Sequence, residues 1–348
     1  MSHGLLAPLT RYRWLYLPLV WLGLALLLIG GLIVLVGANP VTVLGSLLRG
    51  AVGTPDQVGR VIATLAPLLL CCSGLVYTFA AGLYNLGIEG QITLGAVAAT
   101  GALRLLPTSL PAEWLVGLAL LAGVGGGILW GGLAAALHIY GRISEIFAGL
   151  GLNFVGQGLV LYLIFGPWQR QGIASMSGTE LIDPAVRLST WGQTEASPLA
   201  LALGILALLV TMAVLRTTYL GLELRAIGQN PRAAFVLGIP ATERLFSAFY
   251  LCGGLAGLAG AMQVLAVFHR LIPNISSNLG FLGLLVVMLV GFNPLFVLPV
   301  AIFFSVLNVG SLQLPLALQL ESSLAGVIQG TLVLLVLLSR GWAERRTR

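Results

Sequence analysis

Long runs of apolar residues, separated by short polar stretches, dominate the pattern along this chain. A helix needs about 20 consecutive apolar residues to cross the hydrocarbon core of a bilayer. The pattern therefore predicts an all-α, polytopic membrane protein with about ten transmembrane helices in a single transmembrane domain, residues 1–348. The predicted spans are 14–36, 61–80, 83–106, 112–137, 146–166, 198–215, 244–267, 280–293, 295–313 and 322–339.

The composition fits a protein whose solvent is lipid. Hydrophobic residues make up 58% of the chain and charged residues only 8%, whereas soluble domains carry about 25% charged residues. All 17 basic residues are arginine. Because a P-loop needs a lysine that reaches the nucleotide phosphates, the chain by itself cannot be a P-loop ATPase. The arginines are dispersed between apolar runs and form no stripe, which argues against nucleic-acid binding.

The arginines also predict an orientation. With ten spans both termini share one side, which holds eleven arginines against six on the other. The positive-inside rule places the richer side in the cytoplasm, so we expect a multi-pass protein of the inner or plasma membrane with both termini cytoplasmic. The loop 167–197 is then extracytoplasmic and long enough for a short helix, and 216–243 is the largest cytoplasmic loop. The eleven are Arg11, Arg13, Arg142, Arg216, Arg225, Arg232, Arg244, Arg340, Arg345, Arg346 and Arg348.

Glycine is abundant, with 46 residues. Small residues at helical spacing let membrane helices approach closely, so two glycine sets predict tight helix packing. The alternative is that they mark helices that slide during a transport cycle. A weak two-half organisation, with spans two to five matching seven to ten, is typical of inverted-repeat transporters. The two glycine sets are Gly123, Gly127 and Gly131, and Gly253, Gly257 and Gly260.

Residues 82–95 carry the most informative polar groups, Asn85, Glu89 and Gln91, among glycines and between two apolar runs. Asn85 and Glu89 are four residues apart, so on a helix they share a face. A carboxylate at membrane depth is costly and is by default functional, and the glycines predict a broken helix beside a cavity. The alternative is that Glu89 lies near the cytoplasmic interface, where it caps a helix or pairs with an arginine.

Further polar residues lie within other predicted spans, and each could simply join helices by hydrogen bonds. Their presence on several spans favours a wet central path. No metal-ligand spacing or catalytic motif occurs around the three histidines or elsewhere, so we expect no enzyme activity, cofactor or metal. The predicted path residues are Asn85, Glu89, Gln91, Asn153, Gln157 and Asn308.

Three segments carry a resemblance to a known family. Residues 82–99 resemble the N-[IL]-G-[IV]-E-G-Q signature of ABC permeases that import nucleosides and simple sugars, relatives of the ribose and branched-chain amino-acid permeases. Residues 224–239 resemble that group's R-A-x-G-x-N-P-x-A-A-x-x-x-G-I segment, and residues 280–294 its glycine-rich late span. The resemblance covers roughly residues 15–340. Two positions depart from the family pattern. Ser144 precedes Glu145 where Asn is expected, and Phe292 follows Gly291 where a basic residue is usual.

The resemblance implies the permease subunit of an ABC importer. Such a subunit forms the translocation path for a small polar solute, such as a nucleoside or simple sugar, and separate ATPase subunits drive it. It also implies a second permease subunit, the same or related, and an extracytoplasmic substrate-binding lipoprotein. An ion-coupled secondary transporter is the alternative. That class needs intramembrane charges, and Glu89 is the only acidic residue well inside a predicted span.

The second segment also predicts local structure. Pro is disfavoured inside helices and biases the preceding residue away from the α region. Asn230 should therefore cap a short helix over 231–238 with Pro231 at its first position. The resemblance implies that this helix docks into a cleft of the ATPase subunit as a coupling helix; an ordinary solvated helix is the alternative. The predicted coupling residues are Arg225, Gly228, Asn230, Pro231, Arg232 and Gly238.

Overall fold

The computed structural model describes residues 23–24, 27–107, 109–170, 178–192, 194–291 and 293–345, and every regular element within them is helical. The predicted span 14–36 therefore lies partly outside the described residues, as do Arg11 and Arg13. Contacts group the chain into two compact units, residues 1–57 with 306–348, and residues 58–305. The sequence predicts a single transmembrane domain for residues 1–348, and this stays a prediction.

The first unit is built around a bent helix pair. The helix Leu27–Leu35 and α3 (Pro40–Val52) meet at 98°, and the Asn39 side chain begins α3 by accepting a hydrogen bond from the Val41 N–H at 2.9 Å. The unit also contains the end of α13, α14 (Leu314–Leu318) and α15 (Ser323–Arg345). The sequence pattern missed α3 because it is short and its outer face is interrupted by polar residues. The buried core consists of Ile33, Val43, Leu47, Leu307, Leu314 and Ile328.

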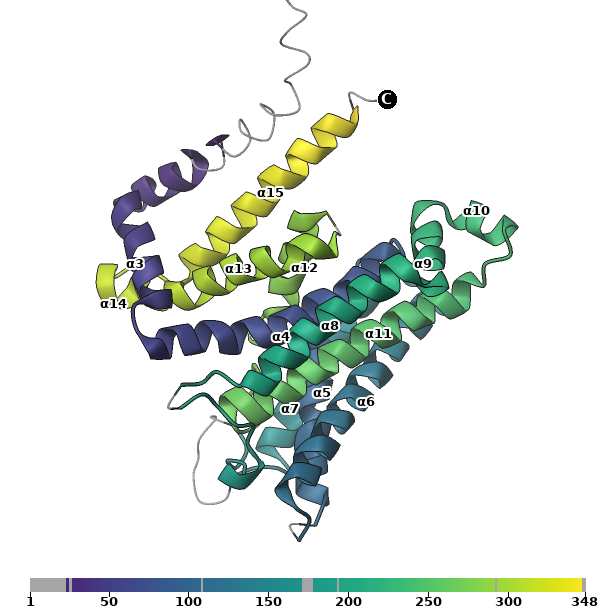
Figure 1. Cartoon of the computed structure of the whole chain (residues 1–348), viewed down its shortest axis with the longest axis horizontal. Helices are drawn as coiled ribbons and strands as arrows, with labels where there is room; N and C mark the ends of the chain where they lie inside the picture. Colours follow the sequence, from purple (N-terminus) through teal and green to yellow (C-terminus); the bar gives the residue numbers. More distant parts are fainter. Residues whose placement is uncertain are drawn as a thin grey trace, which may run out of the picture. The chain divides into compact units, whose positions relative to one another are not determined.

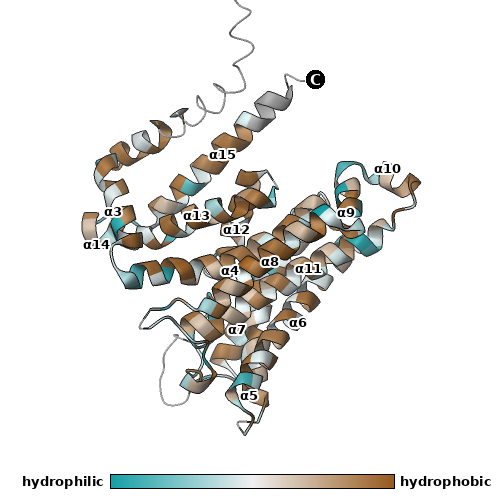
Figure 2. Cartoon of the chain, viewed as in Figure 1, coloured by the Kyte–Doolittle hydropathy of each residue, from teal (hydrophilic) through white to brown (hydrophobic). Residues whose placement is uncertain are grey.

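The second unit holds most of the long helices (Figure 1). Each described part of a predicted span corresponds to a helix, with boundaries within a few residues except at the starts of α4 and α5 and the end of α15. The long apolar helices are the main brown elements of Figure 2. They and their shorter neighbours are α4 (Pro55–Ala80), α5 (Ile88–Leu105), α6 (Ala112–Ile139), α7 (Glu145–Phe165), η1 (Pro184–Val186), α8 (Pro198–Thr217), α9 (Tyr219–Gln229), α10 (Pro231–Val236), α11 (Ala241–Met262), η2 (Gln263–Phe268), α12 (Leu279–Val290), η3 (Pro294–Phe296) and α13 (Val297–Ser311).

The protein is a polytopic membrane protein. Six of the described helices are long and apolar enough to cross a membrane, or seven if the bent pair counts as one span. α5 is not among them, because Glu89, Gln91 and Arg104 lower its hydropathy. α12 and α15 supply shorter apolar stretches. The total of ten spans and the inverted repeat stay predictions.

Glycines join α5, α6 and α11 at backbone distance, as their spacing predicted. A Cβ on Gly127 would lie 2.0 Å from the carbonyl oxygen of Gly253, and one on Gly257 would lie 2.2 Å from that of Gly123. On the other side of α11, a Cβ on Gly260 would lie 1.9 Å from the Ile92 carbonyl oxygen of α5. Such distances exclude any side chain, so α11 is held between α5 and α6 by direct backbone contact.

The loop after α7 is fastened to the end of α11. There the helix widens into the π-helical turn η2 and ends at His269, whose φ is 54°. Backbone N–H groups of the loop satisfy carbonyls of this end: Leu188 donates to Leu265 at 3.1 Å and Ile182 to His269 at 2.8 Å. Burial, and then the charge of Arg187, lower the pKa of His269, so this ring stays neutral near pH 7.

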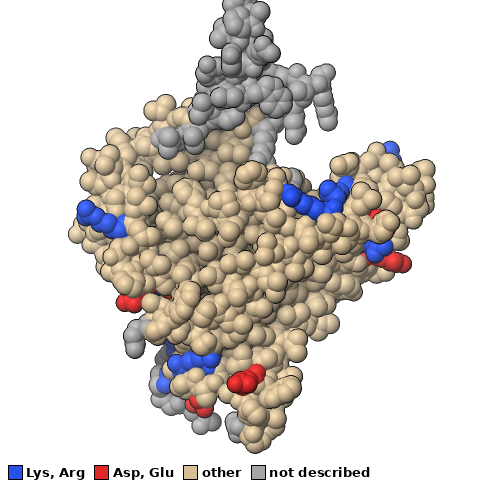
Figure 3. Space-filling model, in the orientation of Figure 1, with Lys and Arg blue, Asp and Glu red and all other residues tan. Residues whose placement is uncertain are grey.

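Figure 3 shows few charged side chains, and most of them lie near the two ends of the long helices of the second unit. One group lies around α9 and α10, and the other around the loop that contains η1. Between them the visible face is uncharged, as expected for a surface in contact with lipid.

Gly127→Ala should lower stability, because its methyl group has no room against α11. Overpacking of this kind costs about 1–3 kcal/mol, so the thermal unfolding midpoint in detergent should fall. The matched control is Gly125→Ala on the same helix, where an added Cβ meets nothing within 4 Å. This control should be neutral or slightly stabilising because Ala is the better helix former. Equal midpoints for the two variants would show that α6 and α11 do not depend on this contact.

Candidate functional site at the break between α4 and α5

The predicted broken helix is present. α4 ends at Ala80 and α5 begins at Ile88, and Gly82 turns the chain with φ +77°. The Gly82 N–H donates to the Phe79 carbonyl at 3.0 Å and the Leu83 N–H to that of Thr78 at 2.9 Å, the hydrogen-bond pattern of a Schellman stop. Asn85 therefore lies outside any helix, and the prediction that it shares a helix face with Glu89 is wrong.

Asn85 and Gln91 form a buried amide pair. Asn85 Nδ2 donates to Gln91 Oε1 at 3.1 Å, and Gln91 Nε2 donates back to Asn85 Oδ1 at 3.4 Å. Asn85 Nδ2 also lies 3.1 Å from the Cys252 Sγ of α11. Both amides are fully buried, at 0% exposure. In this conformation the pair joins the break to α5 and α11 and does not face an open path.

Asn153 on α7 holds the start of α5. Its Oδ1 accepts from the Gly90 N–H at 2.7 Å, and its Nδ2 donates to the Leu86 carbonyl at 2.8 Å. The first N–H groups of a helix lack partners within it, and Gly87 at the cap position has no side chain to supply one. One turn further along α7, Gln157 donates to the carbonyl of Pro273.

Glu89 caps a different helix. Its Oε1 accepts from the Phe281 N–H of α12 at 2.9 Å, while Asn278 at the cap position of α12 makes no side-chain cap hydrogen bond. A carboxylate is favourable at the positive end of a helix. Gly280 leaves room for it, since a Cβ there would lie 2.9 Å from Glu89 Oε1. Of the sequence alternatives, the helix cap matches this contact.

Asn308 makes no described contact with Asn85, Glu89, Gln91 or Asn153. It belongs to the first unit, where its side chain is exposed on α13 and its carbonyl accepts from the Ser311 hydroxyl. Its place in a path stays a prediction.

The loop between α8 and α11 contains two helices, α9 and α10. The predicted cap of α10 is confirmed, because Asn230 Oδ1 accepts from the N–H groups of Arg232 and Ala233, both at 3.1 Å. The helix ends at Val236, two residues earlier than expected. Gly238, with φ +77°, terminates it through a Schellman stop in which the Ile239 N–H donates to the Ala234 carbonyl at 3.1 Å.

This loop touches the break directly. A Cβ on Gly228 would lie 2.3 Å from the Ala80 carbonyl oxygen, and one on Gly82 would lie 3.1 Å from the Gly228 Cα. The sequence placed these glycines in two different motifs and gave no sign that they meet. α9 is also held to α11 by an ion pair between Glu223 and Arg244.

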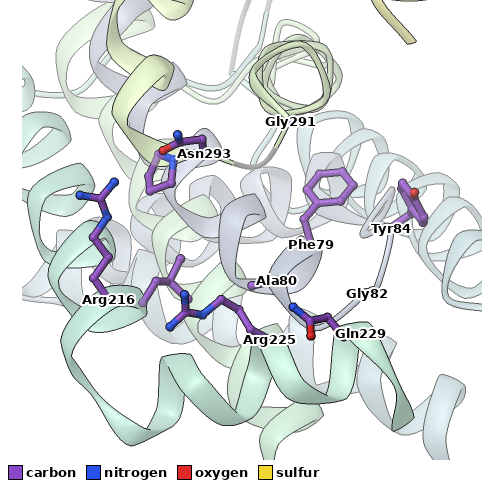
Figure 4. A pocket seen from close by; sticks show the side chains of 12 residues that line it. Phe79, Ala80, Gly82, Tyr84, Arg216, Arg225, Gln229, Gly291 and Asn293 are labelled. Atoms are coloured by element: carbon purple, nitrogen blue, oxygen red, sulfur yellow. The ribbon is translucent and has the colours of Figure 1, made fainter. Parts of the chain in front are cut away.

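A hollow of about 620 Å³ opens beside this contact (Figure 4). Its walls come from the end of α4, the break, the α8–α9 corner and the segment after α12. The lining residues are Phe79, Ala80, Gly82, Tyr84, Leu215, Arg216, Arg225, Gly228, Gln229, Gly291, Asn293 and Pro294.

The described helices form a multi-pass bundle with a polar break inside it, and the loop between α8 and α11 carries a short helix capped at both ends. Residues 57–337 match the family described as the permease component of the branched-chain amino acid transport system. The chain belongs to this family.

Individual relatives agree with this assignment. The chain is 29% identical to a glucose ABC transporter permease protein (TsgB13) of Haloferax volcanii, over 89% of this chain and 84% of the relative. It is 27% identical to a nucleoside ABC transporter permease protein (NupB) of Lactococcus lactis, over 79% and 78%. A guanosine ABC transporter permease protein (NupP) of Bacillus subtilis is 26% identical, over 86% of each chain. The protein is the permease subunit of an ABC importer, and ATP hydrolysis is the task of separate subunits.

Glu89→Leu should reduce transport more than Glu89→Gln. Glutamine keeps an oxygen for the Phe281 N–H, whereas leucine leaves the start of α12 without its cap, and an unsatisfied buried donor costs about 1–3 kcal/mol. The measurement is substrate uptake by the reconstituted transporter at equal protein abundance. Glu113→Leu, which removes an exposed carboxylate from the first turn of α6, is the control and should transport normally. Full uptake by Glu89→Leu would rule out this role.

Proposed function

We propose that this permease forms the path for a small polar solute of the nucleoside or simple-sugar class. The observation that carries the proposal is the polar cluster at the helix break, formed by the buried Asn85, Glu89 and Gln91 and the half-buried Asn153, in a largely apolar bundle. Intramembrane polar groups of this kind characteristically mark substrate pathways. The names of the relatives, which specify glucose, nucleoside and guanosine, support the same chemical class.

Alternation between two conformations would give this polar cluster a role in transport. In the described conformation the amides of Asn85 and Gln91 satisfy each other. Asn153 and Glu89 each satisfy a helix start, at Gly90 on α5 and Phe281 on α12. A state in which α5, α7 and α12 separate would free these groups to meet a hydroxyl- or amide-bearing solute. The solute then contributes binding energy only to that second state, which is what shifting the equilibrium between two states requires.

We further propose that α10 is the element that receives motion from the ATPase. The apolar side chains of Phe235 and Val236, and of Leu237 directly after the helix, are 77%, 83% and 76% exposed. Such exposure is unusual for a solvated helix and fits a helix that docks into a partner's groove. Caps at both ends, Asn230 and Gly238, keep it rigid. The contact between Gly228 and Ala80 provides a route from this loop to the helix break.

The partners follow from the importer class. We propose two ATPase subunits, an extracytoplasmic substrate-binding lipoprotein and a second permease, the same or related. The matches support a related partner, because they include two permease proteins from each of three organisms: TsgB13 and TsgC13, NupB and NupC, and NupP and NupQ. Membership of the ABC permease family decides against the alternative of an ion-coupled secondary transporter.

Disrupting α10 should uncouple the importer without preventing membrane insertion. Pro231→Gly/Arg232→Glu loosens the first turn and reverses its charge, and Gly238→Trp places a bulky side chain at the position that ends the helix. Both variants should lose most of the substrate-stimulated ATPase activity of the reconstituted complex and should retain less ATPase subunit on purification.

Gly192→Trp is the matched control for Gly238→Trp. Both glycines have positive φ, +59° and +77°, and an added Cβ meets nothing within 4 Å at either. Gly192 lies in the loop that we place outside the cell, so this variant should co-purify with a full complement of ATPase subunits. Wild-type stimulation and transport in both α10 variants would show that the loop does not couple.

The orientation can be tested by cysteine labelling. The native Cys71, Cys72 and Cys252 are buried, so they should not react with a membrane-impermeant maleimide. A cysteine introduced at Glu180 should be labelled from outside intact cells, and one at Arg232 only after the membrane is opened. The reverse pattern would overturn the proposal that the termini and α10 are cytoplasmic.

A further inference from the structure

The hollow beside the helix break is unusually positive for a protein with so few charges. Arg216 from the end of α8 and Arg225 from α9 both line it (Figure 4). No acidic residue is among the residues described as lining it. The acidic residue nearest in sequence on α9, Glu223, is engaged by Arg244 of α11. The two positive charges are therefore not neutralised by the walls of the hollow.

Arg225 and Asn293 each keep a donor group that their described hydrogen bonds do not use. The Arg225 Nε donates to the Gly221 carbonyl at 3.1 Å, which fixes the side chain and leaves its terminal nitrogens available. The Asn293 Oδ1 accepts from the Leu295 N–H at 3.2 Å, which leaves the Asn293 amide NH₂ to donate. Two guanidinium groups and an amide donor form a set suited to the oxygens of an oxyanion, since guanidinium binds phosphate in a bidentate manner.

The rest of the wall is mostly apolar, with Gln229 as a further polar side chain. Phe79 and Tyr84 stack edge to face with ring centroids 5.2 Å apart, and Ala80 and Leu215 complete this side. A volume of about 620 Å³ lies within the range of small-molecule sites, roughly 300–1,000 Å³, and exceeds what a lone phosphate fills. The shape and chemistry suit a phosphate that carries a larger organic group.

We propose that this hollow binds the phosphate of an anionic phosphate ester. Two sources share this chemistry: the headgroup of an anionic phospholipid, and a soluble phosphate compound. The apolar wall and the position at the ends of membrane helices favour the lipid, because basic pockets between transmembrane helices bind anionic headgroups. The walls include both the break, through Gly82, and the α9 loop, through Arg225 and Gly228, so a bound headgroup bridges them. The inference does not depend on the transported solute or on ATPase docking.

Binding can be measured on the purified full chain in detergent by native mass spectrometry, during titration with phosphatidylglycerol or with zwitterionic phosphatidylcholine of the same acyl chains. We expect preferential retention of phosphatidylglycerol. Each of Arg216→Gln and Arg225→Gln should weaken it about fivefold, the factor that follows from the usual contribution of one basic residue near a membrane surface. The double variant should weaken retention more than either single change, although effects at two residues that share one ligand need not multiply.

The control is the double variant Arg142→Gln/Arg232→Gln, which removes the same charge from exposed positions that do not line the hollow. It should bind phosphatidylglycerol like the wild type. A second arm replaces lipid with inorganic phosphate or a soluble phosphate monoester and follows the thermal unfolding midpoint. An arginine-dependent rise in this arm without lipid preference identifies the soluble source.

Two results would overturn the proposal: binding that is equal in the wild type and the Arg216/Arg225 variants in both arms, or an equal loss in the control pair, which would indicate general charge attraction. Arg216 is exposed and makes no described ion pair, so Arg216→Gln alone provides a folded test if the double variant is unstable.

Discussion

The structure depends on one requirement of the bilayer: every backbone N–H and carbonyl at membrane depth needs a partner within the protein. Residues 81–87 leave the helical ladder between α4 and α5. Side chains from neighbouring elements meet the requirement. Asn153 satisfies Leu86 and Gly90, and Glu89 satisfies Phe281 of α12. The atoms that supply hydrogen-bond partners to the break are also the atoms best placed to recognise a polar solute.

Glycine contacts determine which parts of the second unit are fixed. Lipid provides little hydrophobic drive for helices to associate, so close van der Waals approach has to hold them. α11 meets α6 through Gly253 and Gly257 and meets α5 through Gly260. The three helices are therefore already in backbone contact and cannot move closer together. Asn153 and Glu89 join α7 and α12 to the start of α5 by hydrogen bonds. α7 also meets this start at backbone distance, since a Cβ on Gly149 would lie 2.4 Å from the Gly87 nitrogen. The start of α5 is therefore held both by a glycine contact and by side-chain hydrogen bonds.

The sequence predicted features that depend on neighbouring residues, and it missed contacts between residues that are far apart along the chain. Apolar runs located the helices, and Asn230-Pro231 predicted the start of α10, because capping is decided within four residues. The pairing of Asn85 with Glu89 on one face failed because Gly82 stops α4 and α5 starts only at Ile88. The sequence offered a helix cap as one role for Glu89 but could not say which helix: Phe281 lies 192 residues further along the chain. The contact of Gly228 with Gly82 was hidden for the same reason, since two glycines far apart in sequence carry no mark of their meeting.

The contact between Gly228 and residues 80–82 has a directional consequence. Its closest approach is backbone against backbone, with no side chain interposed, and no described backbone hydrogen bond links the two segments. A van der Waals contact of this kind strongly resists being pressed together but only weakly resists being pulled apart. In the coupling that we propose, the loop would press the break inward on one stroke. The hydrogen bonds of Asn153 and Glu89 would re-form on the return, so the two halves of the cycle would have separate physical origins.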